Sequence, residues 1–397
     1  MADRRLRIVV GGFLGLLPAG GIAWDYLQYP LGFAMLGHDV YYVEDTLQWP
    51  VYQKAGSDWS DSSSNVAFLK DVMDAFGFAG RWAYRDQASG KCFGLTLDTL
   101  LEVCRTADIF VNVSCSTVLR EEYRRIPVRI VVDSDPMFTQ VQYENQAMMS
   151  SGNTAMQELL MGHSHHFTFG ENIGAEDSRV PNCGLTWHST RQPICLSHWP
   201  VTPLPNDHAA AYTTLMNWSA APPMQYANES WGQKNAEFPR YFSVPRRLHD
   251  VPFAIVVNQT TGAPFPAEEA RRNSWQILDP DEHAPDWHSY RAFIQRSRGE
   301  FSVAKETYVK ARTGWFSCRS ACYLASGRPV VTQETGWSRY IPGGLGLLPF
   351  HDLETAIEAV KRVESDPNEH AKGARETAEE YFDSNRVLQD MLGRVGA

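Results

Sequence analysis

The sequence lacks the cysteine pattern of a disulfide-stabilised secreted protein. Its 397 residues contain seven cysteines, an odd number, and no two of them form a CxxC pair. Disulfide frameworks use paired cysteines and persist in oxidising compartments. We therefore expect free thiols and a cytoplasmic protein.

Long apolar runs are also missing. The best candidate, residues 8–21, follows three arginines but is interrupted by glycines and Pro18, and Trp24 and Asp25 come soon after it. A membrane-spanning helix needs about 20 apolar residues, and a signal peptide needs an unbroken apolar core. We expect no membrane span, and we interpret this run as a strand that enters a glycine-rich loop.

Positive charge is scarce. The chain has 36 lysines and arginines against 46 aspartates and glutamates, which gives a formal net charge of -10. Binding to a polyanion requires a basic face that releases counterions. The charge balance therefore predicts no nucleic-acid partner, although it is compatible with a local basic pocket for one small anionic ligand.

Common cofactor and metal motifs are absent as well. The glycine loop at 11–21 does not have GxGxxG spacing, although Glu44 and Asp45 end the next strand where a dinucleotide-binding fold places its ribose-binding acid. Dinucleotide binding and an acceptor-facing loop are both left open for this segment. There is no HExxH motif, and we expect neither a metal requirement nor a cofactor.

Strands that alternate with helices are present in both halves of the chain. Such alternation is typical of parallel α/β sheets, and the length fits two domains of about 150–200 residues. A proline-rich segment at 182–207 separates the halves. We predict an N-terminal domain at 1–205, a second domain at 206–374, and a C-terminal helix at 375–397 that packs back on the first domain. The strands are expected at residues 7–10, 39–43, 108–113, 127–132, 167–169, 211–217, 253–257, 276–279 and 330–332. Helices are expected at residues 235–241, 266–275 and 369–392, among others.

The stretch from 313 to 337 carries the clearest functional signal. A hydroxyl-rich loop leads into a short apolar helix, which stops at Gly327 and is followed by a β-branched strand. The start of such a helix offers unpaired N–H groups to an anion, and Arg319 adds a rigid set of donors. A diphosphate fits this pattern, and polar residues after the strand could bind sugar hydroxyls; a well-capped helix packed on a sheet is the alternative.

Polar groups also end two strands of the first half. Asp133 and Asp135 follow a buried strand, where neighbouring carboxylates could act as a general base or could simply form an Asx turn that caps the next helix. His165 belongs to a group of three histidines, with His163 and His166. Because no cysteine or HExxH motif accompanies them, we interpret His165 as an acid–base candidate rather than a metal ligand.

The chain resembles the two-domain nucleotide-sugar glycosyltransferases called GT-B. The resemblance is carried by the glycine loop with Gly37-His38-Asp39-Val40, and by SACYLASGRPVVTQETG, which looks like the EAxxxGxPVV segment of that family. The run from Asp133 to Gln140 also looks like the CgeB-like branch, near the GT4 family. The resemblance implies two Rossmann-like parallel-sheet domains that face a cleft.

The resemblance also implies roles for individual residues. The donor would be bound by the second domain and the acceptor by the first. Lys234 would balance charge on the departing nucleotide, although a solvated surface lysine is its alternative. The other donor-binding positions implied are Ser317, Arg319 and Ser320 at the helix start and Glu334, Thr335 and Gly336 after the strand. The acceptor-side loop would include Gly20, Gly21 and Asp25.

These features predict transfer of a sugar from a nucleotide-sugar donor to a small-molecule acceptor, and a homodimer is left open. The sequence departs from the family at Cys322, where a ribose-binding glutamate is usual, and at Gly314, where the first of two paired glutamates would stand. The alternatives are a sugar-nucleotide epimerase of the same fold, a non-catalytic nucleotide-sugar-binding protein, and a dehydrogenase, which the missing GxGxxG disfavours. The sequence does not specify the nucleotide base or the sugar of the donor, the acceptor, or the stereochemical outcome.

Overall fold

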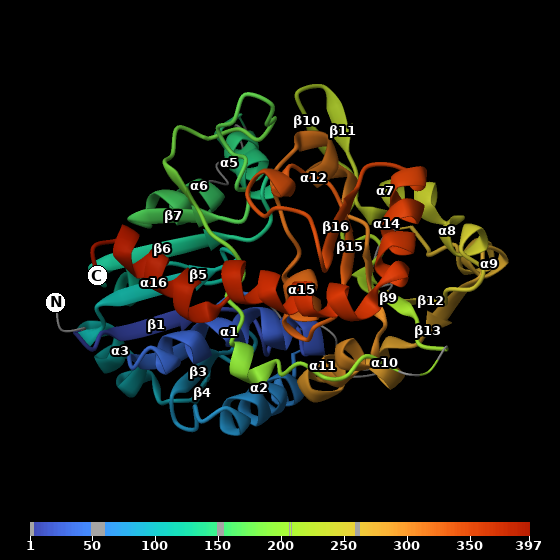
Figure 1. Cartoon of the computed structure of the whole chain (residues 1–397). Coiled ribbons are helices and arrows are strands. Elements are labelled where there is room, and N and C mark those ends of the chain that lie inside the picture. The colour runs from blue at the N-terminus through green and yellow to red at the C-terminus, as the bar shows by residue number, and fades with distance from the viewer. Residues whose placement is uncertain (1–3, 49–59, 149–154, 206, 208, 259–262) are drawn as a thin grey trace.

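The computed structural model describes residues 4–48, 60–148, 155–205, 207, 209–258 and 263–397. Two sheets dominate it, one in each half of the chain, with helices against their faces (Figure 1). The expectation of two Rossmann-like parallel-sheet domains is confirmed. In the described part of the chain, no helix is both long enough and apolar enough to cross a membrane.

The N-terminal sheet has eight strands in the order β4-β3-β2-β1-β5-β6-β7-β8, and all neighbours are parallel except β3 and β4. Its central strands are continuous buried runs, as parallel strands covered on both faces require. The strands are β1 (Arg7–Gly11), β2 (Asp39–Glu44), β3 (Trp82–Arg85), β4 (Cys92–Gly94), β5 (Ile109–Val113), β6 (Val128–Asp133), β7 (His165–Thr168) and β8 (Trp187–Ser189).

The C-terminal sheet has six parallel strands in the order β13-β12-β9-β14-β15-β16, and a separate hairpin joins β10 to β11. In such doubly wound sheets, ligands bind beyond the carboxyl ends of the strands, where the strand order reverses. The reversal falls between β9 and β14 here and between β1 and β5 in the first sheet. The strands are β9 (Tyr212–Asn217), β10 (Met224–Tyr226), β11 (Glu229–Trp231), β12 (Phe253–Asn258), β13 (Trp275–Leu278), β14 (Gly299–Ser302), β15 (Val330–Gln333) and β16 (Leu347–Phe350).

The helices connect successive strands. Those of the first domain are α1 (Gly20–Met35), α2 (Ser63–Ala75), α3 (Leu97–Thr106), α4 (Glu121–Arg124), α5 (Phe138–Met148) and α6 (Ala155–Met161). Those of the second domain are α7 (Lys234–Glu237), α8 (Val244–Arg247), α9 (Ala267–Arg272), α10 (Pro280–His283), α11 (Trp287–Arg296), α12 (Glu306–Ala311) and α13 (Cys318–Ala325). Short 3₁₀ segments lie at η1 (Leu196–His198), η2 (Phe238–Tyr241) and η3 (Trp337–Arg339).

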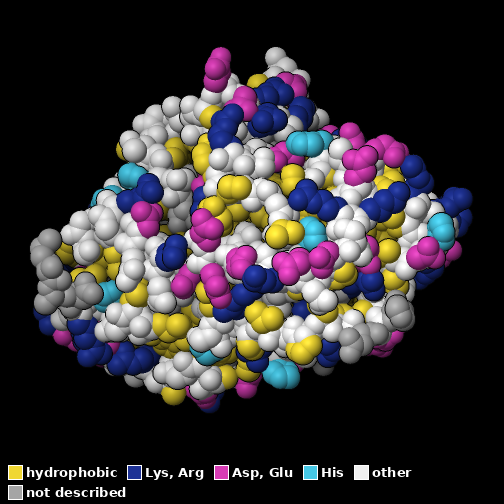
Figure 2. All heavy atoms as spheres, in the orientation of Figure 1, with side chains coloured by type: hydrophobic (Ala, Val, Ile, Leu, Met, Phe, Trp, Pro, Cys, Tyr) yellow, Lys and Arg dark blue, Asp and Glu magenta, His cyan; other side chains and the backbone are white. Residues whose placement is uncertain are grey.

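Three helices form the C-terminal tail: α14 (Leu353–Ser365), α15 (Pro367–Tyr381) and α16 (Ser384–Arg394). A capping box of Asp352 and Thr355 starts α14. Pro367 is in the first turn of α15, where proline is tolerated because backbone N–H groups at this position make no hydrogen bond within the helix. The tail crosses from the second domain to the first, and α16 lies against α1 (Figure 1). Acidic and basic side chains are interspersed on the face that carries it (Figure 2).

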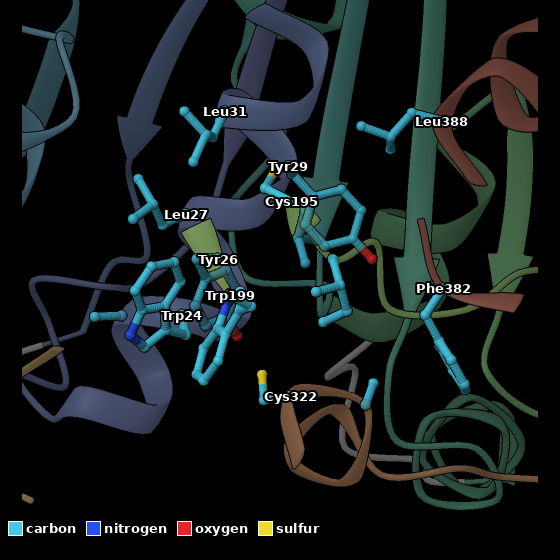
Figure 3. Packing of buried hydrophobic residues seen from close by; sticks show 14 of the residues in the cluster. Trp24, Tyr26, Leu27, Tyr29, Leu31, Cys195, Trp199, Cys322, Phe382 and Leu388 are labelled. Atoms are coloured by element: carbon cyan, nitrogen blue, oxygen red, sulfur yellow. The ribbon is translucent and has the colours of Figure 1, made fainter. Parts of the chain in front are cut away.

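One apolar core is shared by the two domains. Side chains of α1 pack with the linker that precedes the second sheet, with α11 and α13, and with the tail. Gln28 of α1, fully buried, accepts a hydrogen bond from the Cys195 N–H at 2.7 Å. The residues labelled in Figure 3 come from these segments: Trp24, Tyr26, Leu27, Tyr29 and Leu31 from α1, Cys195 and Trp199 from the linker, Cys322 from α13, and Phe382 and Leu388 from the tail.

Some local expectations differ from the structure. The helix expected at 235–241 is α7 followed by the 3₁₀ turn η2, because Pro239 cannot supply an N–H for a continuing helix. Trp275, expected in a helix, begins β13. The single helix expected at 369–392 is broken between α15 and α16, where the N–H of Ile194 bonds to the carbonyl of Phe382.

Candidate functional site

A cleft of about 540 Å³ lies between the carboxyl ends of the two sheets. Its size is within the usual range for small-molecule sites. The first domain contributes the end of the glycine loop, the start of α1, and the residues that follow β5 and β6. The second domain contributes the ends of β9 and β12, the start of α13, and three cationic residues, Lys234, Lys305 and Arg319.

The start of α13 faces this cleft. Ser317 is its N-cap residue, and its side chain makes no capping hydrogen bond. In the described part of the chain, no backbone carbonyl accepts a hydrogen bond from the N–H groups of Cys318, Arg319 and Ser320. Such N–H groups, at the positive end of the helix dipole, attract anions. The Ser320 hydroxyl itself is buried without a partner and is not among the cleft-lining groups.

Arg319 is held by the ends of two strands. Its Nε contacts Glu300 Oε1 at 2.5 Å, and its other nitrogens donate to the Leu215 carbonyl at 2.6 Å and to the Ser302 hydroxyl at 3.0 Å. Although burial opposes the charge, the adjacent Glu300 carboxylate raises the pKa of Arg319. The guanidinium is therefore a fixed, permanently charged group beside the helix start.

Lys234 is the cation of the cleft that lacks a carboxylate partner among the described residues. Its side chain is buried, and its Nζ donates to the Val303 carbonyl at 2.5 Å. Burial lowers its pKa well below the usual value, and the positive charge of Arg319 lowers it further. A buried ammonium between other cations is stabilised by an incoming anion. The surface-lysine alternative for Lys234 is wrong.

A polar clasp, which we define as Asp135, Lys305 and Tyr308, joins the two domains at the cleft. Lys305 Nζ lies 2.7 Å from Asp135 Oδ1, and the Tyr308 hydroxyl contacts the same oxygen. Beside the clasp, Trp315 Nε1 donates to the Ser134 carbonyl at 3.1 Å. Asp135 therefore lines the cleft, as expected of a site residue, but its carboxylate is engaged by the opposite domain.

Asp133 and His165 are placed differently. The Asp133 carboxylate is fully buried and accepts four hydrogen bonds, which fits the Asx-turn alternative rather than a base that meets substrate. Its donors are Thr139 Oγ1, Gln140 Nε2, Thr168 Oγ1 and the Asp135 N–H. His165 is the first residue of β7. It therefore lies at the amino-terminal end of the parallel strands, away from the carboxyl ends that face the cleft, and it bonds to the Ser164 hydroxyl at 2.9 Å. Neither side chain lines the cleft.

The loop of Glu334, Thr335 and Gly336 is covered by the first domain. Glu334 accepts the Gly336 N–H at 2.5 Å, its second carboxylate oxygen is buried without a partner, and Thr335 donates to the Trp315 carbonyl. None of the three lines the cleft. The expected sugar-binding loop is therefore occupied by protein contacts in this arrangement of the domains.

Asn172 is the residue that fills this corner. It is fully buried, its N–H bonds to the Thr313 carbonyl, and its side-chain amide donates to the Arg312 carbonyl at 2.9 Å. Gly314, at a φ of +76°, has no room for a Cβ, since one would lie 2.6 Å from the Asn172 nitrogen. The glycine at 314, where the resemblance would place a glutamate, thus accommodates Asn172.

The acceptor-side residues lie at the start of α1, where the domains touch. A Cβ on Gly20 would lie 2.2 Å from the Asp286 carbonyl oxygen, so glycine permits the close approach of α1 to α11. Gly20, Gly21 and Asp25 all line the cleft. In the glycine loop before them, the N–H groups of Gly15 and Leu16 bond to the buried Glu44 carboxylate, which is therefore engaged by protein rather than free for a ribose.

Several residues of the cleft were missed from the sequence. Lys305 and Tyr308 line the cleft and follow β14, a strand that the sequence pattern does not predict; the same strand holds Glu300, the partner of Arg319. Recognition of β14 would have placed Lys305 at a carboxyl end and thus near the cleft. Ser114 and Ser134, whose hydroxyls lie 2.7 Å apart, follow two correctly predicted strands and could have been found by the same rule.

Comparison with solved structures gives several glycosyltransferases of similar fold. An alpha-glucosyltransferase in complex with UDP and a 13-mer DNA containing a HMU base has a TM-score of 0.61 at 12% identity, over 99% of this chain and 100% of that one. AviGT4, a glycosyltransferase involved in avilamycin A biosynthesis, has a TM-score of 0.55 at 11% identity, over 98% and 96%. Sucrose-phosphate synthase from Thermosynechococcus elongatus has a TM-score of 0.53 at 12% identity, over 98% of each chain.

These similarities show that the chain has the GT-B fold, as the resemblance implied. No family model and no curated protein matches the sequence. The CgeB-like and GT4-like branch therefore stays a prediction.

The exclusion of nucleic-acid partners is wrong. It rested on the net charge of -10, but structures of similar fold are glucosyltransferases bound to DNA. Net charge describes the average field of a protein, whereas recognition depends on the charges at one surface. The acceptor class must therefore be tested without this exclusion.

Proposed function

We propose that this protein is a glycosyltransferase that moves a sugar from a uridine diphosphate donor to an acceptor hydroxyl. The observation that carries the proposal is the start of α13, where unpaired N–H groups stand beside Arg319 and Lys234 in the cleft between two GT-B domains. Uracil is proposed because similar structures contain UDP. A small hydroxylated molecule is the proposed acceptor, and DNA is the competing acceptor that the structural neighbours indicate.

The proposed chemistry follows from the charges of the cleft. Breaking the bond between sugar and diphosphate builds negative charge on the phosphate oxygens. Preorganised donors that stabilise this charge as it forms lower the barrier. The N–H groups at the start of α13 and the fixed guanidinium of Arg319 provide such donors, and Lys234 supplies a charge that an anion holds in place.

Binding of UDP tests the donor site. We expect UDP to raise the melting temperature and uridine to leave it unchanged, because uridine lacks the diphosphate that the cations meet. A ligand at 100 times its Kd stabilises a protein by about 2.7 kcal/mol. Thermal-shift and calorimetric titrations with UDP, UDP-glucose and uridine measure this difference. Equal responses to UDP and uridine would contradict a diphosphate site.

Turnover distinguishes the proposed transferase from its alternatives. With UDP-sugars and a panel of saccharides, small alcohols and hydroxylated DNA oligonucleotides, we expect UDP to be released only when a suitable acceptor is present. A sugar-nucleotide epimerase would convert the donor without releasing UDP. A binding protein would show UDP affinity and no conversion of any donor.

A further inference from the structure

Asp25 is a cleft carboxylate with an unusual environment. It lies on α1 of the first domain and interacts electrostatically with Arg319 of the second domain. Within the residues that the structure describes, its carboxylate accepts no hydrogen bond and forms no ion pair. It is therefore free to meet a substrate group.

The other carboxylates near the cleft are engaged. Asp135, the second cleft-lining carboxylate among the described residues, is held by Lys305 and Tyr308 of the polar clasp. Glu300 is paired with Arg319, and Asp133 is saturated by four hydrogen bonds below the cleft. A proton acceptor for an incoming hydroxyl must have a free lone pair that points into the site. Asp25 meets this requirement.

Burial raises the pKa of Asp25 to about 7, although the charge of Arg319 opposes the rise. The other titratable groups that face it lie on three helices. Burial raises the pKa of each of these tyrosines and thiols, which leaves Asp25 as the group of this set that changes charge near neutrality. They are Tyr26 and Tyr29 on α1, Tyr290 on α11, and Cys318 and Cys322 on α13.

We propose that Asp25 is the catalytic base of the transfer and that the reaction inverts the anomeric carbon. Its carboxylate takes the proton of the acceptor hydroxyl while the acceptor oxygen bonds to the anomeric carbon. The bond from that carbon to the diphosphate breaks, and its electron pair leaves with UDP. Inversion follows from this single displacement, because the acceptor oxygen attacks the face of the anomeric carbon opposite the departing diphosphate. The inference rests on the proposed transferase function.

The Asp25→Asn variant tests the base. We expect kcat to fall by about 10²–10⁴-fold, the usual contribution of a general base, while the Kd for UDP stays within twofold of the wild-type value. Asp25→Glu should recover part of the activity. Asp74→Asn, which removes an exposed carboxylate on α2, is the matched control and should leave both values unchanged.

A pH profile and the product's configuration give readouts that a structural role would not change. The base must be deprotonated, so kcat/KM of the wild type should rise with pH as Asp25 loses its proton near pH 7. In Asp25→Asn this acidic limb should disappear. NMR of the product from a UDP-α-sugar should show a β linkage.

The outcomes separate this inference from the proposed function. Wild-type protein that fails to bind UDP or to transfer a sugar would overturn both. UDP-dependent transfer that is unchanged in Asp25→Asn, or that gives an α-linked product, would overturn the base or the inversion and leave the transferase intact.

Discussion

The Lys234→Met variant is expected to lose about 99% or more of kcat/KM for the UDP-sugar. The change keeps an unbranched side chain that is one atom shorter, and it removes the one cleft cation that has no carboxylate partner among the described residues. Loss of one preorganised donor to a developing negative charge typically costs about 10²–10³-fold in rate. Steady-state kinetics and UDP titrations measure the effect.

Stability should move differently from activity in this variant. A buried ammonium with one carbonyl partner costs desolvation free energy, so its replacement by an apolar side chain should leave the melting temperature unchanged or raise it. Lys361→Met, an exposed change on α14, is the matched control. If Lys234→Met transferred sugar at the wild-type rate, the assignment of Lys234 to the leaving group would be wrong.

The lowered pKa of Lys234 also gives a signed pH dependence. An ammonium that is disfavoured in the empty cleft becomes favoured beside a diphosphate, so the complex holds more protons than the free protein. UDP binding should therefore take up protons, and its affinity should weaken as pH rises between the two pKa values. Calorimetry in buffers of different ionisation enthalpy counts the protons, and the uptake should vanish in Lys234→Met.

The Glu300→Gln variant is expected to show the largest loss of stability. Glu300 is fully buried and forms an ion pair with Arg319, which is itself held by Leu215 and Ser302. Removal of one partner leaves a buried charge without compensation and typically costs about 3–5 kcal/mol. Because the whole chain of 397 residues is expected to unfold as one unit, with an unfolding entropy of about 2.1 cal/mol/K per residue, the melting temperature should fall by about 4–6 °C.

UDP should partly rescue this variant, because its diphosphate supplies the negative charge that Arg319 has lost. The rise in melting temperature on adding UDP should accordingly be larger in Glu300→Gln than in the wild type. Glu358→Gln, an exposed change on α14, is the control and should behave as the wild type. A Glu300→Gln protein as stable as the wild type would show that the pair with Arg319 does not support the donor wall.

The parallel sheets could be predicted because their strands carry a local signal. β5 and β12 are short, mainly apolar runs with three β-branched residues each, and the structure places them within one residue of the expected bounds. β14 was missed because it begins with glycine and contains a charged residue. The burial of Glu300 depends on Arg319, which is supplied by a helix 19 residues later in the chain. A local pattern does not show such a pairing.

The candidate site divides in the same way. The start of α13 was predicted because a loop, a short helix and a glycine stop are consecutive in the sequence. Asp133 and Asp135 have the same residue type and almost the same position, yet one is buried below the cleft and the other reaches Lys305 of the other domain. Asp25 differs from both because no described side chain donates a hydrogen bond to its carboxylate. These differences arise from the placement of the domains, which spacing along the chain does not specify.

The core shared by α1, α11, α13 and the tail has a consequence for how the molecule comes apart. Because aromatic side chains of both halves are buried against one another, neither half alone would keep them from water. Each half expressed separately is therefore expected to aggregate, and denaturant should unfold the whole chain in a single cooperative transition.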